Sequence, residues 1–343
     1  MTGRACGSRV RILTTGGTIA SRRDPHGALR VEDSGRLLLS WPEVAEAAES
    51  LNVEEFAVTG SHRLTLDDSW RLARRIRALT DDPGDGIVVT HGTDCMEESA
   101  FLAALLNRSG APVIFTGAQR SADSKRPDGP RNLCDAIRLA TDPDARRLGV
   151  VVAMNGTAFQ ARDATKTSTD SLQAFDAPGH RPVARIRGGN VRVLIAAPPQ
   201  AALHDDAVPE RLRRVDIIPV YLGVDELLLS AAVAGGAEGI VLDAMGSGNV
   251  TPPIFAGVSQ ALAQGILVAV TSRVPSGSVS ATYGDCGGYD LAAIGAVMLG
   301  DLKAAKARLA LSVALSATRD PKRAWHLTRS LAGVAEERGA PCF

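Results

Sequence analysis

Polar side chains follow three apolar stretches of this sequence, and their types suit chemistry on a carbonyl group. "TTGGT" ends with Thr18, "THGTD" contains Thr93 and Asp94, and "RDATKT" contains Lys166. A threonine hydroxyl becomes a nucleophile when a neighbouring group accepts its proton. A lysine is one candidate for that group, provided that its side chain is a neutral amine. The four residues together are therefore a candidate catalytic set.

Each of these residues also has a purely structural explanation. Thr18 can cap a turn, and Thr93 can be an ordinary turn residue. Asp94 lies three residues before Glu97 and ahead of the helical run "MEESAFLAALL", which is typical of a helix N-cap. Lysines are mostly exposed, so Lys166 can simply be solvated. Taken one at a time, the residue types do not decide between the catalytic and the structural explanation.

Short apolar runs predict the elements that must position this set. Residues 11–15, 87–90, 113–115 and 150–154 are nearly continuous in apolar side chains, as in buried parallel strands. Helical patterns lie between them, and Pro130 is well placed in the first turn of one helix. The alternation predicts an α/β fold whose N-terminal domain is a doubly wound, mostly parallel sheet. Ligands of such sheets bind beyond the carboxyl ends of the strands, where Thr18, Thr93, Asp94 and Lys166 are expected.

A change of pattern predicts two domains. "VARIRGGNVRVLIAA" at 183–197 has the alternation of a β-hairpin, with its turn at Gly188–Gly189–Asn190. Residues 198–213 contain proline and acid without a period and predict a linker. The predicted organisation is an N-terminal catalytic α/β domain over 1–197 and a smaller C-terminal α/β domain over 214–343. Its expected elements are strands at 215–220, 240–243 and 266–271 and a helix over 301–317.

The composition bears on the classes of partner. The 343 residues include 38 Lys and Arg and 38 Asp and Glu, so the formal net charge is zero. A neutral chain offers no electrostatic argument for nucleic acid or an anionic membrane, and neither is expected as a partner. No apolar run approaches the roughly 18 residues of a membrane span or resembles a secretory leader, which predicts a cytoplasmic protein. The spacing of cysteines and histidines fits no metal motif, and no phosphate-binding glycine motif is present.

Seven motifs occur in order along nearly the whole chain: "TTGGTIAS", "THGTDCMEESA", "VIFTGAQR", "DGPRNL", "ARDATKT", "SRVPSG" and "DLKAAKARLALSVAL". Together they resemble the L-asparaginase family of threonine amidohydrolases. The resemblance implies hydrolysis of L-asparagine to L-aspartate and ammonia through a threonine acyl-enzyme, without a cofactor. It also implies a homotetramer built from two close dimers, with active sites at the close dimer interface.

By position, the resemblance implies a role for each residue. Thr18 matches the family's nucleophile, and Thr93, Asp94 and Lys166 match a Thr–Lys–Asp triad. Ser61 matches the serine that holds the substrate α-carboxylate, and Asp94 would also face the α-ammonium group. The resemblance implies further substrate contacts. They are the backbone of the two glycine turns (Gly17 and Gly92), a backbone contact for the amide (Ala118), the residue after Ser61 (His62) and a residue from a neighbouring subunit (Asn249).

Two departures from the family pattern leave alternatives open. The lid "RRDPHGALRVEDSGRLLLS" at 22–40 has no tyrosine, although family members usually carry one there. One hypothesis is that Tyr283 of a neighbouring subunit hydrogen-bonds to Thr18 instead; the alternative is that Tyr283 packs in a glycine-rich turn with its hydroxyl in solvent. His62 stands where many asparaginases have glutamine. A different or modified amide substrate, or a non-catalytic protein that binds an amino acid, are the rival functions.

Overall fold

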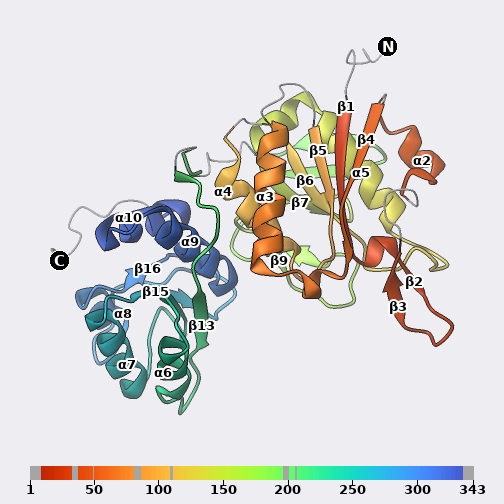
Figure 1. The fold of residues 1–343 in the computed structure, drawn as a ribbon. Helices are drawn as coiled ribbons and strands as arrows, with labels where there is room; N and C mark the ends of the chain where they lie inside the picture. Colours follow the sequence, from red (N-terminus) through yellow and green to blue (C-terminus); the bar gives the residue numbers. More distant parts are fainter. Residues whose placement is uncertain are drawn as a thin grey trace. The chain divides into compact units, whose positions relative to one another are not determined.

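The computed structural model describes residues 9–32, 38–48, 50–80, 86–108, 111–195, 201–204 and 207–334. The chain divides into two compact units, Met1–Pro199 and Gln200–Phe343, shown along the sequence in Figure 1. Of the predicted linker 198–213, residues 198–200 and 205–206 lie outside the described residues.

An eight-stranded sheet forms the centre of the first unit. Five of its strands run parallel in the order β4, β1, β5, β6, β7, and three antiparallel strands, β8, β11 and β12, extend one edge. The strands β5, β6 and β7 are buried at every position, which explains their continuous apolar runs. The bounds are β1 (Arg9–Gly16), β4 (Ser50–Thr59), β5 (Gly86–Thr90), β6 (Val113–Thr116), β7 (Val150–Met154), β8 (Thr157–Gln160), β11 (Ala184–Arg187) and β12 (Asn190–Val193).

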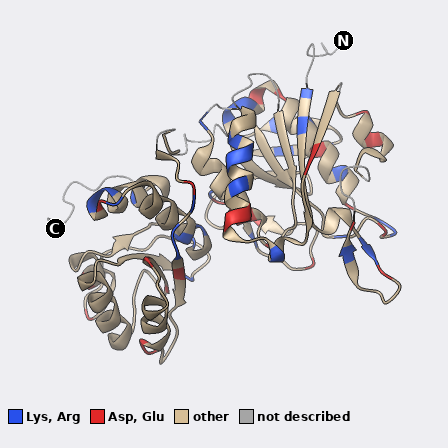
Figure 2. Ribbon diagram, in the orientation of Figure 1, with Lys and Arg blue, Asp and Glu red and all other residues tan. Residues whose placement is uncertain are grey.

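Helices cover this sheet because each one has an apolar stripe. In α3 (Leu66–Thr80) the stripe is Leu72, Ile76 and Leu79, all buried, and Figure 2 shows the basic residues of α3 beside the acidic ones at its start. Helix α4 (Met96–Leu106) packs against α3. Helix α5 (Gly129–Thr141) packs with the short α2 (Pro42–Ala45) and against the sheet. Pro130 lies in the first turn of α5, as predicted.

Short elements connect these layers. They are the 3₁₀ turns η1 (Thr18–Ala20), η2 (Ser61–Arg63) and η3 (Pro143–Leu148), the hairpin of β2 (Ser21–Arg23) and β3 (Leu29–Val31), and the pair of β9 (Thr165–Lys166) and β10 (Phe175–Asp176). The hairpin predicted at 183–197 is present as β11 and β12, with its turn one residue shorter than expected; residues 196–197 lie outside the described residues. Arg187 pairs directly with Asn190, because Gly188 and Gly189 adopt positive φ values of 55° and 82° and close the loop by themselves.

The second unit is a smaller parallel sheet with helices. Its strand order is β13, β14, β15, β16, and all neighbouring strands are parallel. The α/β fold class is therefore confirmed for both units. The bounds are β13 (Val215–Pro219), α6 (Leu227–Ala234), β14 (Gly239–Ala244), α7 (Pro252–Ala263), β15 (Leu267–Ser272), α8 (Gly288–Ala293), β16 (Val297–Met298), α9 (Ala304–Ala317) and α10 (Pro321–Leu331). None of the helices described is long and apolar enough to cross a membrane.

Candidate active site

The loops that follow β1 and β5 touch each other backbone to backbone. Gly17 has φ 80° and ψ −173°, and its N–H donates to the carbonyl of Thr59 over 3.0 Å. A Cβ atom on Gly17 would lie 2.4 Å from the Cα of Gly92, closer than real side chains come. Both the positive φ and the close approach require glycine at position 17. The glycine pair thus joins two strand ends at the carboxyl edge of the sheet.

A third loop meets the same point. Ser61 begins η2, directly after β4, and a Cβ atom on Gly92 would lie 2.7 Å from its Oγ. The residue is only 3% exposed, and its hydroxyl has no hydrogen-bond partner within the part of the chain that the structure describes. A buried polar group without a partner is costly. A bound ligand with an acceptor or donor at this position would remove that cost.

Lys166 joins the second and third polar clusters of the sequence. Its Nζ donates to Thr93 Oγ1 over 2.8 Å and to Asp94 Oδ1 over 2.7 Å. Thr93 is 5% exposed, and the side chains of Lys166 and Asp94 are 19% and 57% exposed. The ammonium group is therefore held by two protein groups, which is not the solvated surface lysine of the structural explanation.

The capping explanation for Asp94 is wrong. The N-cap of α4 is Cys95, and no side chain of the cap residue hydrogen-bonds to the helix. The Asp94 carboxylate pairs with Lys166 instead. Glu97, expected as the capping partner of Asp94, accepts the backbone N–H of Lys166 at 3.0 Å. Because Glu97 belongs to the first turn of α4, this hydrogen bond ties the strand of Lys166, β9, to the start of that helix.

Two further residues position the set and were not predicted from the sequence. Thr93 Oγ1 lies 3.5 Å from Gln119 Oε1, and Gln119 Nε2 donates to the carbonyl of Ser171. Glu97 is the other. The only sequence signal for Gln119 is its place beside Ala118 in "TGAQR". Its side chain links the loop after β5 to the segment between β9 and β10.

His91 is completely buried beside Gly92. Its Nδ1 lies 2.8 Å from the Gly92 carbonyl, which can only accept, so Nδ1 carries the proton. Burial lowers the pKa of His91 to about 4, which keeps the imidazole neutral. Its Nε2 has no partner among the described residues. The ring therefore fixes the peptide that follows Gly92 without bringing a charge to the site.

The other predicted residues of the first unit lie on the same loops. Thr18 is half-buried and opens η1, and the N-cap residue Gly17 offers no side chain to cap it. His62 is exposed, with Nδ1 4.0 Å from Asp94 Oδ2, which is beyond hydrogen-bonding distance. Ala118 is buried after β6, where Asn132 Nδ2 donates to the neighbouring Gly117 carbonyl.

Asn249 and Tyr283 belong to the second unit. Asn249 is half-buried in the turn after β14, and its Oδ1 is buried with no hydrogen-bond partner among the described residues. Tyr283 is 58% exposed, in the loop before α8. Both are therefore placed where another molecule can reach part of the side chain. In the lid, residues 33–37 lie outside the described residues.

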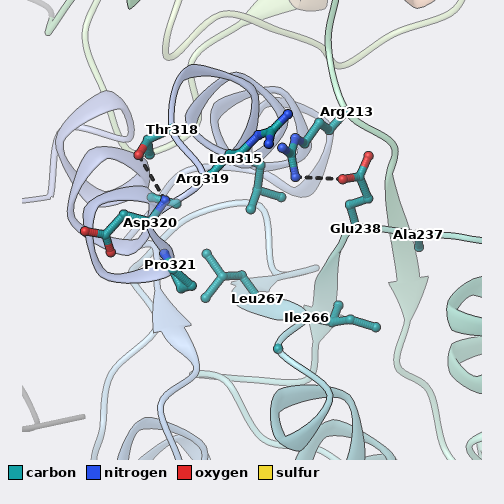
Figure 3. Close-up of a pocket in the computed structure, with 12 residues that line it drawn as sticks. Arg213, Ala237, Glu238, Ile266, Leu267, Leu315, Thr318, Arg319, Asp320 and Pro321 are labelled. Atoms are coloured by element: carbon teal, nitrogen blue, oxygen red, sulfur yellow. Dashed lines mark hydrogen bonds and ion pairs between the residues drawn. The ribbon is translucent and has the colours of Figure 1, made fainter.

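A cavity of about 250 Å³ in the second unit is not a second candidate (Figure 3). It lies at the amino ends of β14 and β15, whereas open α/β sheets bind ligands at the carboxyl ends. Its Arg213 and Glu238 are paired with each other over 2.8 Å. None of the predicted site residues lines it.

Comparison with known proteins identifies the family of this chain. Residues 9–198 match the family model described as "Asparaginase, N-terminal", and residues 214–327 match "Glutaminase/Asparaginase C-terminal domain". The L-asparaginase of Bacillus licheniformis is 35% identical over 91% of this chain and 97% of its own, and L-asparaginase 2 of Escherichia coli is 34% identical over 92% and 90%. The crystal structure of the probable cytoplasmic L-asparaginase from Campylobacter jejuni superimposes with a TM-score of 0.84 at 31% identity, covering 94% of this chain and 100% of that one. The chain therefore belongs to the asparaginase family and is an amidohydrolase that acts on C–N bonds.

Proposed function

We propose that this enzyme hydrolyses L-asparagine to L-aspartate and ammonia through a threonine acyl-enzyme. The observation that carries the proposal is the contact of Lys166 with both Thr93 and Asp94, beside the loops of Gly17 and Ser61. A buried hydroxyl beside an amine, at the carboxyl edge of a parallel sheet, is suited to acyl transfer. Relatives named L-asparaginase support the choice of substrate.

The proposed first step uses Thr18. Its oxygen attacks the side-chain amide carbon of asparagine, and its proton passes to the amide nitrogen, which leaves as ammonia. The backbone N–H of Gly92 is proposed to bind the oxyanion, because the N–H of Gly17 is already donated to the carbonyl of Thr59. Water then attacks the ester. Its proton passes through Thr93 to the Lys166 amine, 2.8 Å from the Thr93 hydroxyl, and then to the Thr18 oxygen as that oxygen leaves the acyl carbon. The product is aspartate and free Thr18.

The proposed substrate contacts follow the charges of the amino acid. The partnerless hydroxyl of Ser61 is placed to donate to the α-carboxylate. The Asp94 carboxylate, more than half exposed, has room to accept the α-ammonium group besides Lys166. The backbone at Ala118 is proposed to contact the amide. His62, 4.0 Å from Asp94, supports a second candidate: an amide substrate that is modified or larger than asparagine.

The proposal includes the assembly and the location. Asn249 and Tyr283 are proposed to reach the site of a neighbouring subunit in a homotetramer. Their exposure or missing partners support this role. We propose a catalytic domain over 1–197 and a C-terminal domain over 214–343. The ranges of the two family matches support this division. A cytoplasmic location is supported by the name of the Campylobacter jejuni protein, whereas the Haemophilus influenzae relative is named as periplasmic.

Ammonia release from a panel of amides tests the function. The panel is L-asparagine, L-glutamine, D-asparagine and an N-alkylated asparagine, each with wild type, Thr18→Ala and Thr93→Val. We expect the highest kcat/KM with L-asparagine and a loss of about a hundredfold or more in each variant, because residues that act as a unit fail together. A preference for another amide would favour the second candidate, and binding without ammonia release would favour a non-catalytic protein. Substantial turnover by Thr18→Ala would contradict the assignment of the nucleophile.

A further inference from the structure

A second cavity lies in the first unit, at the edge of the sheet that carries the antiparallel strands. Its volume is about 340 Å³, within the range of small-molecule sites. The residues that matter are Arg131, Arg185, Arg187, Asn155, Gly156 and Gln173. It shares no residue with the candidate active site, and the proposed reaction uses none of its side chains.

A tight turn forms one side of this cavity. Asn155 and Gly156 have φ values of 49° and 72°, the succession of positive φ found in two-residue hairpins, and they connect β7 to β8. The Gly156 carbonyl accepts the N–H of Ile186, and a Cβ atom on Gly156 would lie 2.6 Å from the Ile186 carbonyl. The same Cβ atom would lie 3.5 Å from Arg131 Nη2. The turn therefore brings an arginine of α5 to the strand that carries two others.

The arginines of β11 have no counter-charge in the part of the chain that the structure describes. Arg185 lies opposite Arg192 in the register of β11 and β12, and directly opposed like charges destabilise a hairpin. Arg185 and Arg187 share one face of the strand, because side chains alternate along it. Among the described residues, neither guanidinium makes a hydrogen bond or an ion pair. Arg131 has Asp135 only at 3.8 Å, beyond hydrogen-bonding distance.

The remaining wall is polar and neutral. Asn155 Nδ2 donates to Gln173 Oε1 over 3.3 Å, and Gln173 Nε2 donates to the Phe175 carbonyl over 2.8 Å. Three guanidinium groups around such a wall match an anion with several oxygen atoms, because each group can donate two parallel hydrogen bonds to carboxylate or phosphate. We propose that this cavity binds a small polyanion with at least two phosphate or carboxylate groups. Binding there would also offset the repulsion between Arg185 and Arg192.

Calorimetric titration of the full-length protein tests the site. The probes are inorganic pyrophosphate and, separately, citrate, each at an ionic strength held constant with sodium chloride. We expect one saturable site per chain for at least one probe, and the tighter probe identifies phosphate or carboxylate as the preferred group. Arg185→Gln and Arg187→Gln should each weaken binding by about fivefold or more, because glutamine keeps a polar side chain but cannot form the charged fork.

The matched control is Arg192→Gln. It removes the same charge from the same hairpin, but Arg192 does not line the cavity. We expect it to change the affinity by about twofold or less, since Arg192 does not line the cavity and salt screens an exposed charge. Circular dichroism and thermal unfolding confirm that each variant is folded. The proposal is overturned if neither probe binds saturably, if Arg185→Gln and Arg187→Gln bind as wild type, or if Arg192→Gln loses as much affinity as they do.

Discussion

Lys166 donates hydrogen bonds to two acceptors, Thr93 and Asp94. Its ion pair with Asp94 involves a carboxylate that is 57% exposed. Such pairs contribute about 0–1 kcal/mol to folding, so stability does not explain why the three side chains converge. The geometry instead places an amine within 2.8 Å of a buried threonine hydroxyl. At the scale of the residue, this geometry supports the proposed proton transfer.

Replacement of Lys166 by methionine separates catalysis from packing. Lys166→Met keeps the apolar stem and removes the amine, so we expect kcat to fall by about a hundredfold or more. The midpoint of thermal unfolding should stay close to that of wild type. Ammonia release and a thermal scan measure the two quantities. The control is Lys125→Met, which changes an exposed lysine of the same unit. A near-normal rate in Lys166→Met would favour a surface role for this lysine.

Buried His91 makes stability depend on pH. Its pKa is about 4 in the folded chain and about 6.5 when unfolded, so between these values the unfolded chain binds a proton that the folded chain does not. Stability from this residue is complete above about pH 6.5 and is lost as the pH falls toward 4. The difference between these two pKa values corresponds to a loss of about 3 kcal/mol.

Urea unfolding across this pH range measures the loss. The difference in unfolding free energy between wild type and His91→Gln should shrink toward acid pH, because carboxylates titrate alike in both proteins. His26→Gln, which replaces an exposed histidine, is the control and should leave the pH profile unchanged. A pH-independent difference between wild type and His91→Gln would show that the imidazole is not held neutral.

At the scale of the elements, strand ends bring the site together. The strands β4, β1 and β5 are neighbours in the sheet, and the loops after them carry Ser61, Gly17 and Gly92. Because parallel strands end at one edge, their loops necessarily approach each other there. The absence of a Cβ atom at Gly17 lets the two backbones touch. Glycine at this position is thus a packing requirement of the candidate active site.

Gly17→Ala tests that requirement. We expect a loss of about 2–4 kcal/mol in unfolding free energy, which combines strain at positive φ with a collision against Gly92, and a fall in kcat/KM of about tenfold or more. Gly149→Ala is the matched control. Gly149 has φ 64° and ψ −127°, but a Cβ atom there meets nothing within 4 Å. It should cost about 1–2 kcal/mol and leave kcat/KM unchanged. Equal effects of the two substitutions would show that the close approach is unimportant.

At the scale of the whole molecule, the second unit bears on the assembly. It carries Asn249, whose buried Oδ1 lacks a partner among the described residues, and the exposed Tyr283. Both features are expected of side chains that complete a site in another subunit. A shared site also predicts that the chain forms at least dimers in solution, which light scattering measures. An active monomer at micromolar concentration would contradict a shared site.

Mixing two inactive variants tests the shared site. Thr18→Ala and Asn249→Ala should each lose most activity, but mixed subunits should recover up to about a quarter of the wild-type sites, because half of the dimers then contain one intact pair. No recovery after unfolding and refolding the mixture would contradict the arrangement. Each variant refolded alone is the control.

Tyr283→Phe tests whether the Tyr283 hydroxyl takes the place of the lid tyrosine that this chain lacks. It removes only the hydroxyl, so a fall in kcat of about tenfold, or about 1.4 kcal/mol, would support a hydrogen bond to Thr18 of a neighbouring subunit. Tyr289→Phe, which alters an equally exposed tyrosine of the second unit, is the control. An unchanged kcat in Tyr283→Phe would contradict this hydrogen bond and favour a Tyr283 hydroxyl that points into solvent.

The sequence by itself determined several of the elements and the family. The strand predicted at 150–154 is β7, and the apolar stripe of Leu72, Ile76 and Leu79 is the buried face of α3. These features were predictable because hydrophobic periodicity and proline placement act within a few residues. The order of motifs along the chain was likewise enough to indicate an asparaginase, which the family matches confirm.

Only the tertiary structure decided which polar residues meet. Lys166 and Thr93 are 73 positions apart, and the order of strands β5, β6 and β7 together with the β9–β10 pair brings them to 2.8 Å. Locally, Asp94 and Glu97 had the spacing of a helix cap; in the fold, each is bonded to Lys166 instead. The local pattern could not show this, because strand order and register depend on packing between distant segments. The cluster of arginines around Gly156 has the same origin, since α5 and two hairpins meet there only after folding.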